Sequence, residues 1–410
     1  MGEKILAPGL ALKEHSFEVP LDHLGEPGPK ITVFAREVAD PDGGERPFLV
    51  FFQGGPGFEA PRPTRVPSSP GWLDRALSEF RVLMLDPRGT GRSTPIGTLE
   101  GMTPTEQAEY LSHFRADSIV RDAEHIRRQL GVDRWSVLGQ SFGGFCVTSY
   151  VSQAPEGLRE ALITGGLPPL GRSIDEVYAK TYERVVERNR RYRKRYPEDR
   201  ERLAALRRRL EHQDMRLPGG DVLTWRRFRQ LGSMLGMSDG AEHLHYILEL
   251  PHDSPGFLHD VESAVAFARN PIYAILHEAC YADGGSTGWS AERMRPAEFE
   301  TEDLLTGEHV YPWMFEDYGA LAPLRDAAEL LAHREWGLLY DRGTLESNEV
   351  PAAAIIYAED MYVESRLSEA TARQIAGLKI WITNEYEHNG LRADGARILS
   401  RLLDLARGRA

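Results

Sequence analysis

One short segment, residues 135–145, restricts the possible fold more than any other part of the chain. It reads Trp-Ser-Val-Leu-Gly-Gln-Ser-Phe-Gly-Gly-Phe: an apolar run, a Gly-x-Ser-x-Gly turn and a stretch compatible with a helix. A serine placed between a buried strand and a helix in this way sits at a tight turn that exposes its hydroxyl. Gly139 and Gly143 lack the Cβ atoms that would clash with the neighbouring strand and helix. The pattern predicts a nucleophile at Ser141, and a strand-to-helix turn without a catalytic role is the alternative.

Buried-strand patterns on both sides of this segment indicate a parallel sheet. Continuous apolar runs, which are typical of strands covered on both faces, occur at 47–52, 80–85, 161–164, 350–357 and 378–383. Two alternating stretches at 15–19 and 31–38 predict an antiparallel opening pair. Asp117 is a plausible N-cap of a helix, and an amphipathic helix ends the chain. The alternation of buried strands with helices predicts an α/β fold.

The pattern changes between about residues 170 and 322, where Arg, Glu, His and aromatic residues are frequent and the period is mostly helical. We therefore expect a sheet domain built from residues 1–169 and 323–410, with a helical cap inserted at 170–322. Such an insertion must lie over the carboxyl ends of the strands, where open α/β sheets bind ligands. Its dense Arg and Glu run at 184–209 predicts a solvated helical hairpin with i,i+4 ion pairs rather than a binding patch.

A serine hydroxyl is a weak nucleophile until a base accepts its proton, and the base needs an orienting group. After this motif the acid and then the histidine are expected in that order, each just beyond a strand. Asp360 lies three residues beyond the run that ends at Tyr357, with Glu359 as its immediate competitor. His388 follows the last predicted strand and is the only histidine after Asp360. We predict that Asp360 orients His388 and that His388 is the general base.

Acyl transfer also needs two N–H donors for the oxyanion. Phe142, directly after the serine, is expected to supply one of them. The loop Gln-Gly-Gly-Pro-Gly at 53–57 is expected to supply the other from Gly54 or Gly55, since glycine lets the backbone approach a substrate carbonyl. A tight turn without a catalytic role is again the alternative. The segment at 86–93 lacks the ending of a phosphate loop, and we interpret it as a structural turn whose arginine, Arg88, braces the site.

Composition excludes several classes of function. The chain has 410 residues, of which 41% are hydrophobic, so a sizeable core can form. Its net charge of −13 argues against a nucleic-acid or anionic-membrane surface. We find no apolar run near the ~20 residues of a membrane span and no secretory signal. Two cysteines, Cys146 and Cys280, make neither a disulfide framework nor a zinc site. We expect a cytoplasmic protein without metal or cofactor, and the number of subunits stays open.

Three motifs together resemble the proline iminopeptidases of the α/β-hydrolase fold: Gly-Gly-Pro-Gly at 54–57, Asp-Pro-Arg-Gly-x-Gly-x-Ser at 86–93 and Gly-Gln-Ser-Phe-Gly-Gly at 139–144. The resemblance implies a mostly parallel central sheet with an inserted helical cap. It also implies a serine peptidase that releases N-terminal proline from small peptides through an acyl-enzyme. One departure is Gln53, where many members of the family have histidine.

A peptidase of this kind must hold a free amino or imino group as a cation, which calls for carboxylates in the cap. Glu278 stands at the position that matches the family, and Glu308 is the second candidate. Either could instead be an ordinary acid on the cap surface. Four aromatic residues are candidates for a pyrrolidine pocket or for the core of the cap: Phe142, Tyr281, Tyr311 and Trp313.

Two other functions are compatible with the same residues. An esterase or amidase acting on a small substrate without a free amine would use Ser141, Asp360 and His388 but would have no use for Glu278. A non-catalytic binding protein could keep the fold without the chemistry, and the presence of the nucleophile, acid and histidine argues against it.

Overall fold

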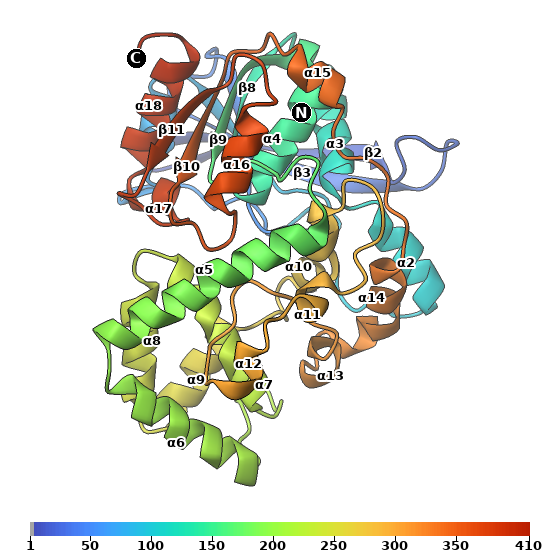
Figure 1. The fold of residues 1–410 in the computed structure, drawn as a ribbon. Helices are drawn as coiled ribbons and strands as arrows, with labels where there is room; N and C mark the ends of the chain where they lie inside the picture. Colours follow the sequence, from blue (N-terminus) through green and yellow to red (C-terminus); the bar gives the residue numbers. More distant parts are fainter. Residues whose placement is uncertain (1–3) are drawn as a thin grey trace.

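The computed structural model describes residues 4–410, and a nine-stranded sheet lies at its centre (Figure 1). The strand order is β1-β2-β3-β7-β4-β8-β9-β10-β11. The strands are β1 (Lys4–Ala7), β2 (Leu10–Pro20), β3 (Lys30–Ala39), β4 (Phe48–Phe52), β7 (Arg81–Leu85), β8 (Trp135–Gln140), β9 (Leu158–Thr164), β10 (Ala352–Tyr357) and β11 (Lys379–Thr383). A separate small hairpin consists of β5 (Thr64–Arg65) and β6 (Ser68–Ser69).

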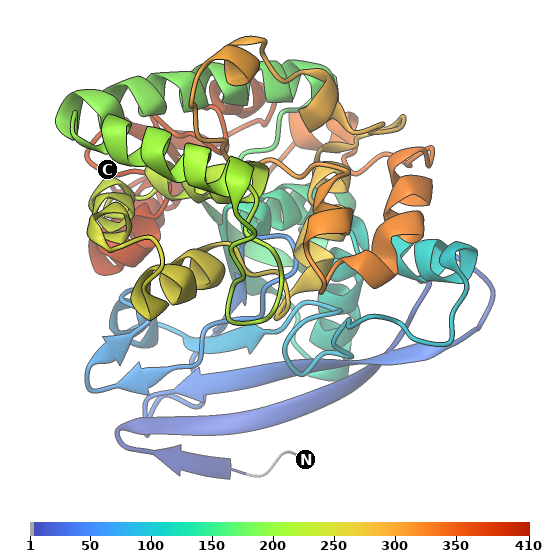
Figure 2. The same cartoon turned by 90° about the horizontal axis from the view of Figure 1, so that it is seen from below.

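Most of the sheet is parallel, as predicted. All neighbouring strands from β7 to β11 in this order pair in parallel, whereas β2 is antiparallel to both β1 and β3, and β3 is antiparallel to β7. Every residue of β4 and β10 is buried, which explains why these strands appear in the sequence as continuous apolar runs. The run at 378–383 does form a strand, but the expectation that it is covered on both faces is wrong: β11 is the edge strand of the sheet, and Ile380 and Ile382 are 41% and 44% exposed. Figure 2 shows the long strands β2 and β3 on the side of the molecule away from helix α5 (Ile174–Arg195).

Helices cover both faces of the sheet. The helices α3 (Ala116–Gln129) and α4 (Phe142–Gln153) belong to one core cluster, and α1 (Leu73–Leu77) and α18 (Gly395–Ala406) pack in a second one. The apolar residues predicted for the last helix are all buried: Ile398, Leu399, Leu402, Leu403 and Leu405. The predicted N-cap at Asp117 is wrong, because Arg115 has the extended cap conformation and α3 begins at Ala116. Asp117 instead lies in the first turn, where its negative charge is favourable.

The chain between β9 and β10 is mostly helical, and in Figure 1 most of it lies below the sheet. Its elements are α5, α6 (Asp199–His212), α7 (Trp225–Phe228), η2 (Arg229–Gly236), α8 (Gly240–Glu249), α9 (Pro255–Ala264), α10 (Pro271–Leu276), η3 (Glu278–Tyr281), α11 (Ser290–Arg293), α12 (Glu298–Thr301), α13 (Met314–Asp317), η4 (Ala322–Leu324), α14 (Arg325–Ala332) and α15 (Arg342–Glu346). The remaining helices are α2 (Pro104–Ser112), η1 (Pro155–Gly157), α16 (Ser365–Ala372) and α17 (Gly390–Ala393). Within residues 4–410, no helix combines the length and hydropathy needed to cross a bilayer.

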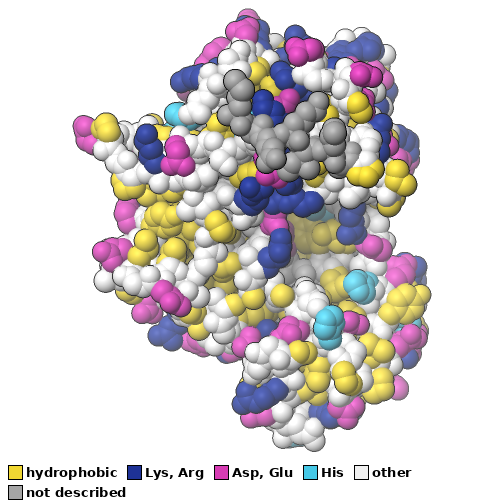
Figure 3. Space-filling model, turned by 180° about the vertical axis from the view of Figure 1, so that it is seen from behind, with side chains coloured by type: hydrophobic (Ala, Val, Ile, Leu, Met, Phe, Trp, Pro, Cys, Tyr) yellow, Lys and Arg dark blue, Asp and Glu magenta, His cyan; other side chains and the backbone are white. Residues whose placement is uncertain are grey.

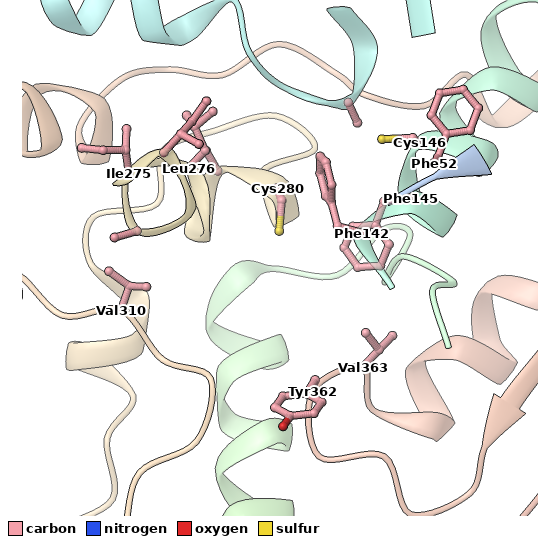
Figure 4. Close-up of a cluster of buried hydrophobic side chains, with 14 of the residues drawn as sticks. Phe52, Phe142, Phe145, Cys146, Ile275, Leu276, Cys280, Val310, Tyr362 and Val363 are labelled. Atoms are coloured by element: carbon pink, nitrogen blue, oxygen red, sulfur yellow. The ribbon is translucent and has the colours of Figure 1, made fainter. Parts of the chain in front are cut away.

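The apolar core continues from the sheet domain into this helical layer. Figure 4 shows Phe142 and Phe145 of α4 in one cluster with Cys280 of η3 and with Tyr362 and Val363, which follow β10. Because these side chains come from both sides of the boundary, the helical layer is packed against the ends of the strands. This packing encloses the cavity described next.

Candidate active site

Ser141 occupies the turn between β8 and α4 with an unusual backbone conformation. Its φ is 55° and its ψ is −124°, a positive φ that L-residues adopt only under strain. A Cβ atom on Gly143 would lie 2.0 Å from the carbonyl oxygen of Phe52, and one on Gly139 would lie 2.2 Å from that of Gly143. Glycine is therefore required on both sides of the serine, because β4, β8 and α4 approach too closely for a side chain. This is the predicted nucleophile-elbow geometry.

Asp360 and His388 meet beyond the ends of β10 and β11. Oδ2 of Asp360 is 2.7 Å from Nδ1 of His388, and both residues are buried. Oδ1 of Asp360 accepts hydrogen bonds from the backbone N–H groups of Tyr362 (2.8 Å) and Val363 (3.0 Å), which hold the carboxylate in place. Glu359, the competing acid, instead pairs with Arg191 on the surface. Geometry therefore favours Asp360 as the partner of the imidazole.

The charge balance around His388 favours an imidazole that can accept a proton. Burial alone would lower the pKa of His388, but the adjacent charge and hydrogen bond of Asp360, together with the charge of Glu308, raise it above its ordinary value. The Tyr362 ring packs edge-on against the imidazole, with centroids 4.7 Å apart. The imidazole of His388 is thus held by the buried carboxylate of Asp360 and covered by the ring of Tyr362.

Ser141 and His388 line the same cavity, which has a volume of about 770 Å³. The sheet side of its wall includes Gly54, Ser141 and His388, and the helical side includes Tyr273 and Glu308. Figure 3 shows the face turned away in Figure 1, which is hollowed between the two parts of the molecule. Within the described residues, no hydrogen bond joins Oγ of Ser141 to the imidazole. Catalytic hydrogen bonds of this type often tighten only when substrate is bound.

The candidate oxyanion donors lie beside the serine. A Cβ atom on Gly54 would be 3.0 Å from Cβ and 3.6 Å from Oγ of Ser141, so the Gly54 backbone faces the nucleophile directly. Gly55 also lines the cavity and has a φ of 135°, a conformation suited to glycine. Phe142 is the first residue of α4, where backbone N–H groups lack helical partners and negative charge is favoured.

Glu308 lies in the cavity wall, held by two residues of the helical layer. The Tyr273 hydroxyl donates a 2.6 Å hydrogen bond to Oε1, and Nε2 of His277 is 3.7 Å from Oε2. Burial alone would raise the pKa of Glu308, but His277, the Tyr273 hydroxyl and His388 outweigh burial and hold it below the usual value. The carboxylate is therefore negatively charged at neutral pH and accessible from the cavity.

Glu278 has a different environment from Glu308. It lies on η3, is buried outside the cavity lining, and its Oε1 accepts a 2.8 Å hydrogen bond from the backbone of Ala291. Burial raises its pKa above the ordinary value. Oε2 is buried without a hydrogen-bond partner among the described residues. The structure thus places the second candidate, Glu308, against the cavity and the first behind it.

The aromatic lining differs from the residues considered in the sequence. Tyr311 is buried in the helical layer, where its hydroxyl lies 2.8 Å from that of Tyr182, and Trp313 stacks on its ring. The cavity wall of the described chain is instead lined by other rings, including Phe58, Trp72, Phe267, Tyr273 and Tyr362. Tyr273 lies five residues before Glu278 and Tyr362 two residues after Asp360, so proximity to these two candidate residues was the available signal.

Arg88 does not brace the site, contrary to the expectation from sequence. Its buried guanidinium pairs with Asp122 and donates hydrogen bonds to the backbone carbonyls of Pro20, Leu21 and His113. It therefore fastens the end of β2 and the turn before α3 to the sheet. A buried arginine with one carboxylate satisfies its remaining donors on whichever carbonyls surround it.

Comparison with known proteins adds an independent observation to this geometry. A family model described as the alpha/beta hydrolase fold matches residues 47–274. A proline iminopeptidase from Aeromonas sobria is 48% identical, and the alignment covers 97% of each chain. The proline iminopeptidase aneH from Aspergillus aculeatus is 36% identical, covering 97% of this chain and 94% of the relative. Among solved structures, a 2-hydroxy-6-oxo-6-phenylhexa-2,4-dienoate hydrolase from Rhodococcus overlays with a TM-score of 0.47 and 14% identity, covering 97% of this chain and 99% of that one. The match to the family model and the two near full-length relatives show that the chain belongs to the proline iminopeptidase family of α/β hydrolases.

Proposed function

We propose that this protein is a serine aminopeptidase that releases N-terminal proline from small peptides. The observation that carries the proposal is a single cavity whose wall holds Ser141, His388 and the negatively charged Glu308. A hydrolase of neutral substrates has no need for a carboxylate that faces the cavity there. A peptide with a free N-terminus brings a cation that such a carboxylate would bind.

The reaction follows from the roles proposed for the three residues. His388, oriented by Asp360, takes the proton of Ser141 as Oγ attacks the scissile carbonyl. Backbone N–H groups of Gly54 or Gly55 and of Phe142 stabilise the oxyanion. His388 then gives the proton to the leaving amine, and the C–N bond breaks to leave a prolyl ester on the serine. A water molecule, deprotonated by His388, hydrolyses this ester and restores the hydroxyl.

The amine subsite is proposed to centre on Glu308. Its carboxylate is oriented by Tyr273 and His277, and rings of Phe267 and Tyr273 in the same wall suit a pyrrolidine ring. Glu278 is proposed as a second carboxylate in the layer behind this wall: it does not line the cavity, and its Oε2 is buried and unpaired within the described chain. Strictness for proline and the length of peptide accepted depend on this wall.

A short series of substrates and variants tests the proposal. The wild type is expected to hydrolyse proline anilide, to discriminate against its N-acetylated form, and to be labelled by a fluorophosphonate. Ser141→Ala is expected to lose labelling and at least about 10⁴-fold in kcat. Equal hydrolysis of both anilides would instead indicate an esterase or amidase, and near-full activity of Ser141→Ala would exclude the mechanism.

The proposal includes the organisation of the chain and its setting. Residues 1–169 and 323–410 form the catalytic domain, and residues 170–322 form a cap that carries the amine subsite. We propose a cytoplasmic enzyme acting on small peptides, without nucleic-acid or membrane partners and without a metal or cofactor in the chemistry.

A further inference from the structure

One arginine of helix α5 contacts the two loops that carry Asp360 and His388. The Arg188 side chain is 12% exposed. Its Nη1 donates a 2.7 Å hydrogen bond to Oε1 of Glu387, and its Nη2 donates a 2.7 Å hydrogen bond to the backbone carbonyl of Glu359. Glu359 directly precedes Asp360, and Glu387 directly precedes His388. A single guanidinium therefore joins the residues that stand before the acid and before the base.

This contact can hold the two loops at a fixed distance from each other. The planar guanidinium presents its donors in a fixed fork, so two acceptors bound to it are held at a defined separation. Glu387 is 24% exposed and Arg188 less, so water screens the ion pair only in part. The two loops come from the neighbouring strands β10 and β11, and a small relative shift of their ends would change the distance between the carboxylate and the imidazole.

The helical layer holds the histidine loop at a second place. The backbone N–H of His388 donates a 3.3 Å hydrogen bond to the carbonyl of Gly236. The side-chain oxygen of Asn389 accepts hydrogen bonds from the backbone N–H (3.0 Å) and the hydroxyl (2.8 Å) of Ser238. Arg188 is therefore one of several contacts on this loop, and it also contacts the residue before Asp360.

We propose that Arg188 is a positioning residue that sets the contact between Asp360 and His388 from the cap. The inference rests on the catalytic roles proposed above for these two residues. It also changes the interpretation of the Arg and Glu run at 184–209. Arg191 and Arg207 make the expected i,i+4 pairs with Glu187 and Glu211, whereas Arg188 contacts the catalytic loops.

Arg191 supplies a matched control on the same helix. It is 46% exposed and pairs with the side chains of Glu359 and Glu187, and its described contacts do not reach the histidine loop. Arg191→Gln also removes one positive charge from helix α5, and it releases the side chain of Glu359, the residue whose backbone carbonyl Arg188 binds. It leaves the hydrogen bonds from Arg188 to Glu359 and Glu387 in place.

Steady-state kinetics on proline anilide give the first test. Arg188→Gln and Glu387→Gln are each expected to lower kcat about 10- to 100-fold with little change in KM, since a displacement of about 1 Å has this effect. The double variant is expected to be no worse than Arg188→Gln alone, because Glu387→Gln removes part of the same contact. Arg188→Lys should recover only part of the rate, since an ammonium lacks the fork. Thermal unfolding checks that the variants are folded. If Arg188→Gln does not fold, kcat and KM of Glu387→Gln are compared with those of the wild type instead.

A spectroscopic measurement on the resting enzyme tests the inference independently of the substrate. Asp360 and Glu308 raise the pKa of His388 while burial lowers it, so a loosened Asp360 contact should lower that pKa. Proton NMR of the imidazole is expected to show a lower His388 pKa and a faster-exchanging Nδ1 proton in Arg188→Gln, but not in Arg191→Gln.

The possible outcomes separate the two proposals. An unchanged imidazole titration and unchanged kcat in Arg188→Gln, or additive losses in the double variant, would overturn the positioning role. The wild type could be inactive on proline anilide and still differ from Arg188→Gln in the pKa of His388. That result would contradict the proposed function and support the positioning role.

Discussion

The hydroxyl of Tyr273 donates a 2.6 Å hydrogen bond to Glu308, which directs one carboxylate oxygen while the other faces His277 at 3.7 Å. This contact joins α10 to the loop after α12, and both residues line the cavity that contains Ser141. The position of the negative charge in the cavity wall therefore depends on packing within the helical layer.

Glu308→Gln keeps the shape of this side chain and removes its charge. The loss of a charged hydrogen bond to the substrate amine, worth about 1.5–3 kcal/mol, should lower kcat/KM for proline anilide by about 10- to 100-fold. Hydrolysis of N-acetylproline anilide should not fall, because this substrate carries no cation. Glu316→Gln, which changes a 55% exposed acid of the same layer, serves as the control. A similar loss on both anilides would argue against amine binding by Glu308.

The same variant should move the pH profile. His388 must be neutral to accept the proton of Ser141, so the acidic limb of kcat/KM reports its pKa in the free enzyme. Glu308 is one of the charges that raise this pKa, and its removal should therefore shift the acidic limb to lower pH. The profile is measured between pH 4 and 9. The ionic strength is kept constant, on the order of 0.1 M, so that screening of the charges does not change with pH. A shift to higher pH would contradict this charge balance.

The choice between two adjacent acids can be tested by matched amide substitutions. Asp360→Asn should lower kcat by roughly 10⁴-fold, since an amide beside Nδ1 favours the wrong tautomer of His388. Glu359→Gln should leave kcat within about 3-fold, because surface ion pairs contribute little and this side chain faces Arg191 rather than the imidazole. Comparable losses in the two variants would indicate that Asp360 has no special role.

The glycine after the elbow should be sensitive to a single methyl group. In Gly143→Ala the new Cβ would lie 2.0 Å from the Phe52 carbonyl oxygen, so β4 or α4 must move. We expect a loss of roughly 2–4 kcal/mol in the free energy of unfolding, measured by denaturant titration. Gly97→Ala, where no atom lies within 4 Å of the added carbon, should change it by less than about 0.5 kcal/mol. Equal effects at both sites would be inconsistent with close packing at the elbow.

Much of the fold could be predicted from local patterns. Apolar runs located the parallel strands, and the candidates expected after three of them come together: Ser141 and His388 line one cavity, and Asp360 contacts His388. This succeeds because strand burial gives a local signal, and because the carboxyl ends of parallel strands meet at one edge of the sheet. The prediction of Asp117 as an N-cap was wrong because an aspartate is favourable both at the N-cap and in the first turn of a helix, so the sequence alone does not separate the two positions.

The helical layer shows where local patterns end. Its short helices and loops give no period that indicates which acid faces the cavity. The resemblance to the family ranked Glu278 before Glu308, whereas packing placed Glu308 in the cavity wall. In the arginine-rich helix α5, spacing predicted i,i+4 ion pairs, of which Arg191 with Glu187 is one, but not the contacts of Arg188. Sequence by itself determined the strands, the elbow and the order of the catalytic candidates, because each depends on neighbouring residues. Tertiary structure decided which charges reach the cavity and the catalytic loops, because that depends on how a helix is rotated and docked against residues up to 199 positions away.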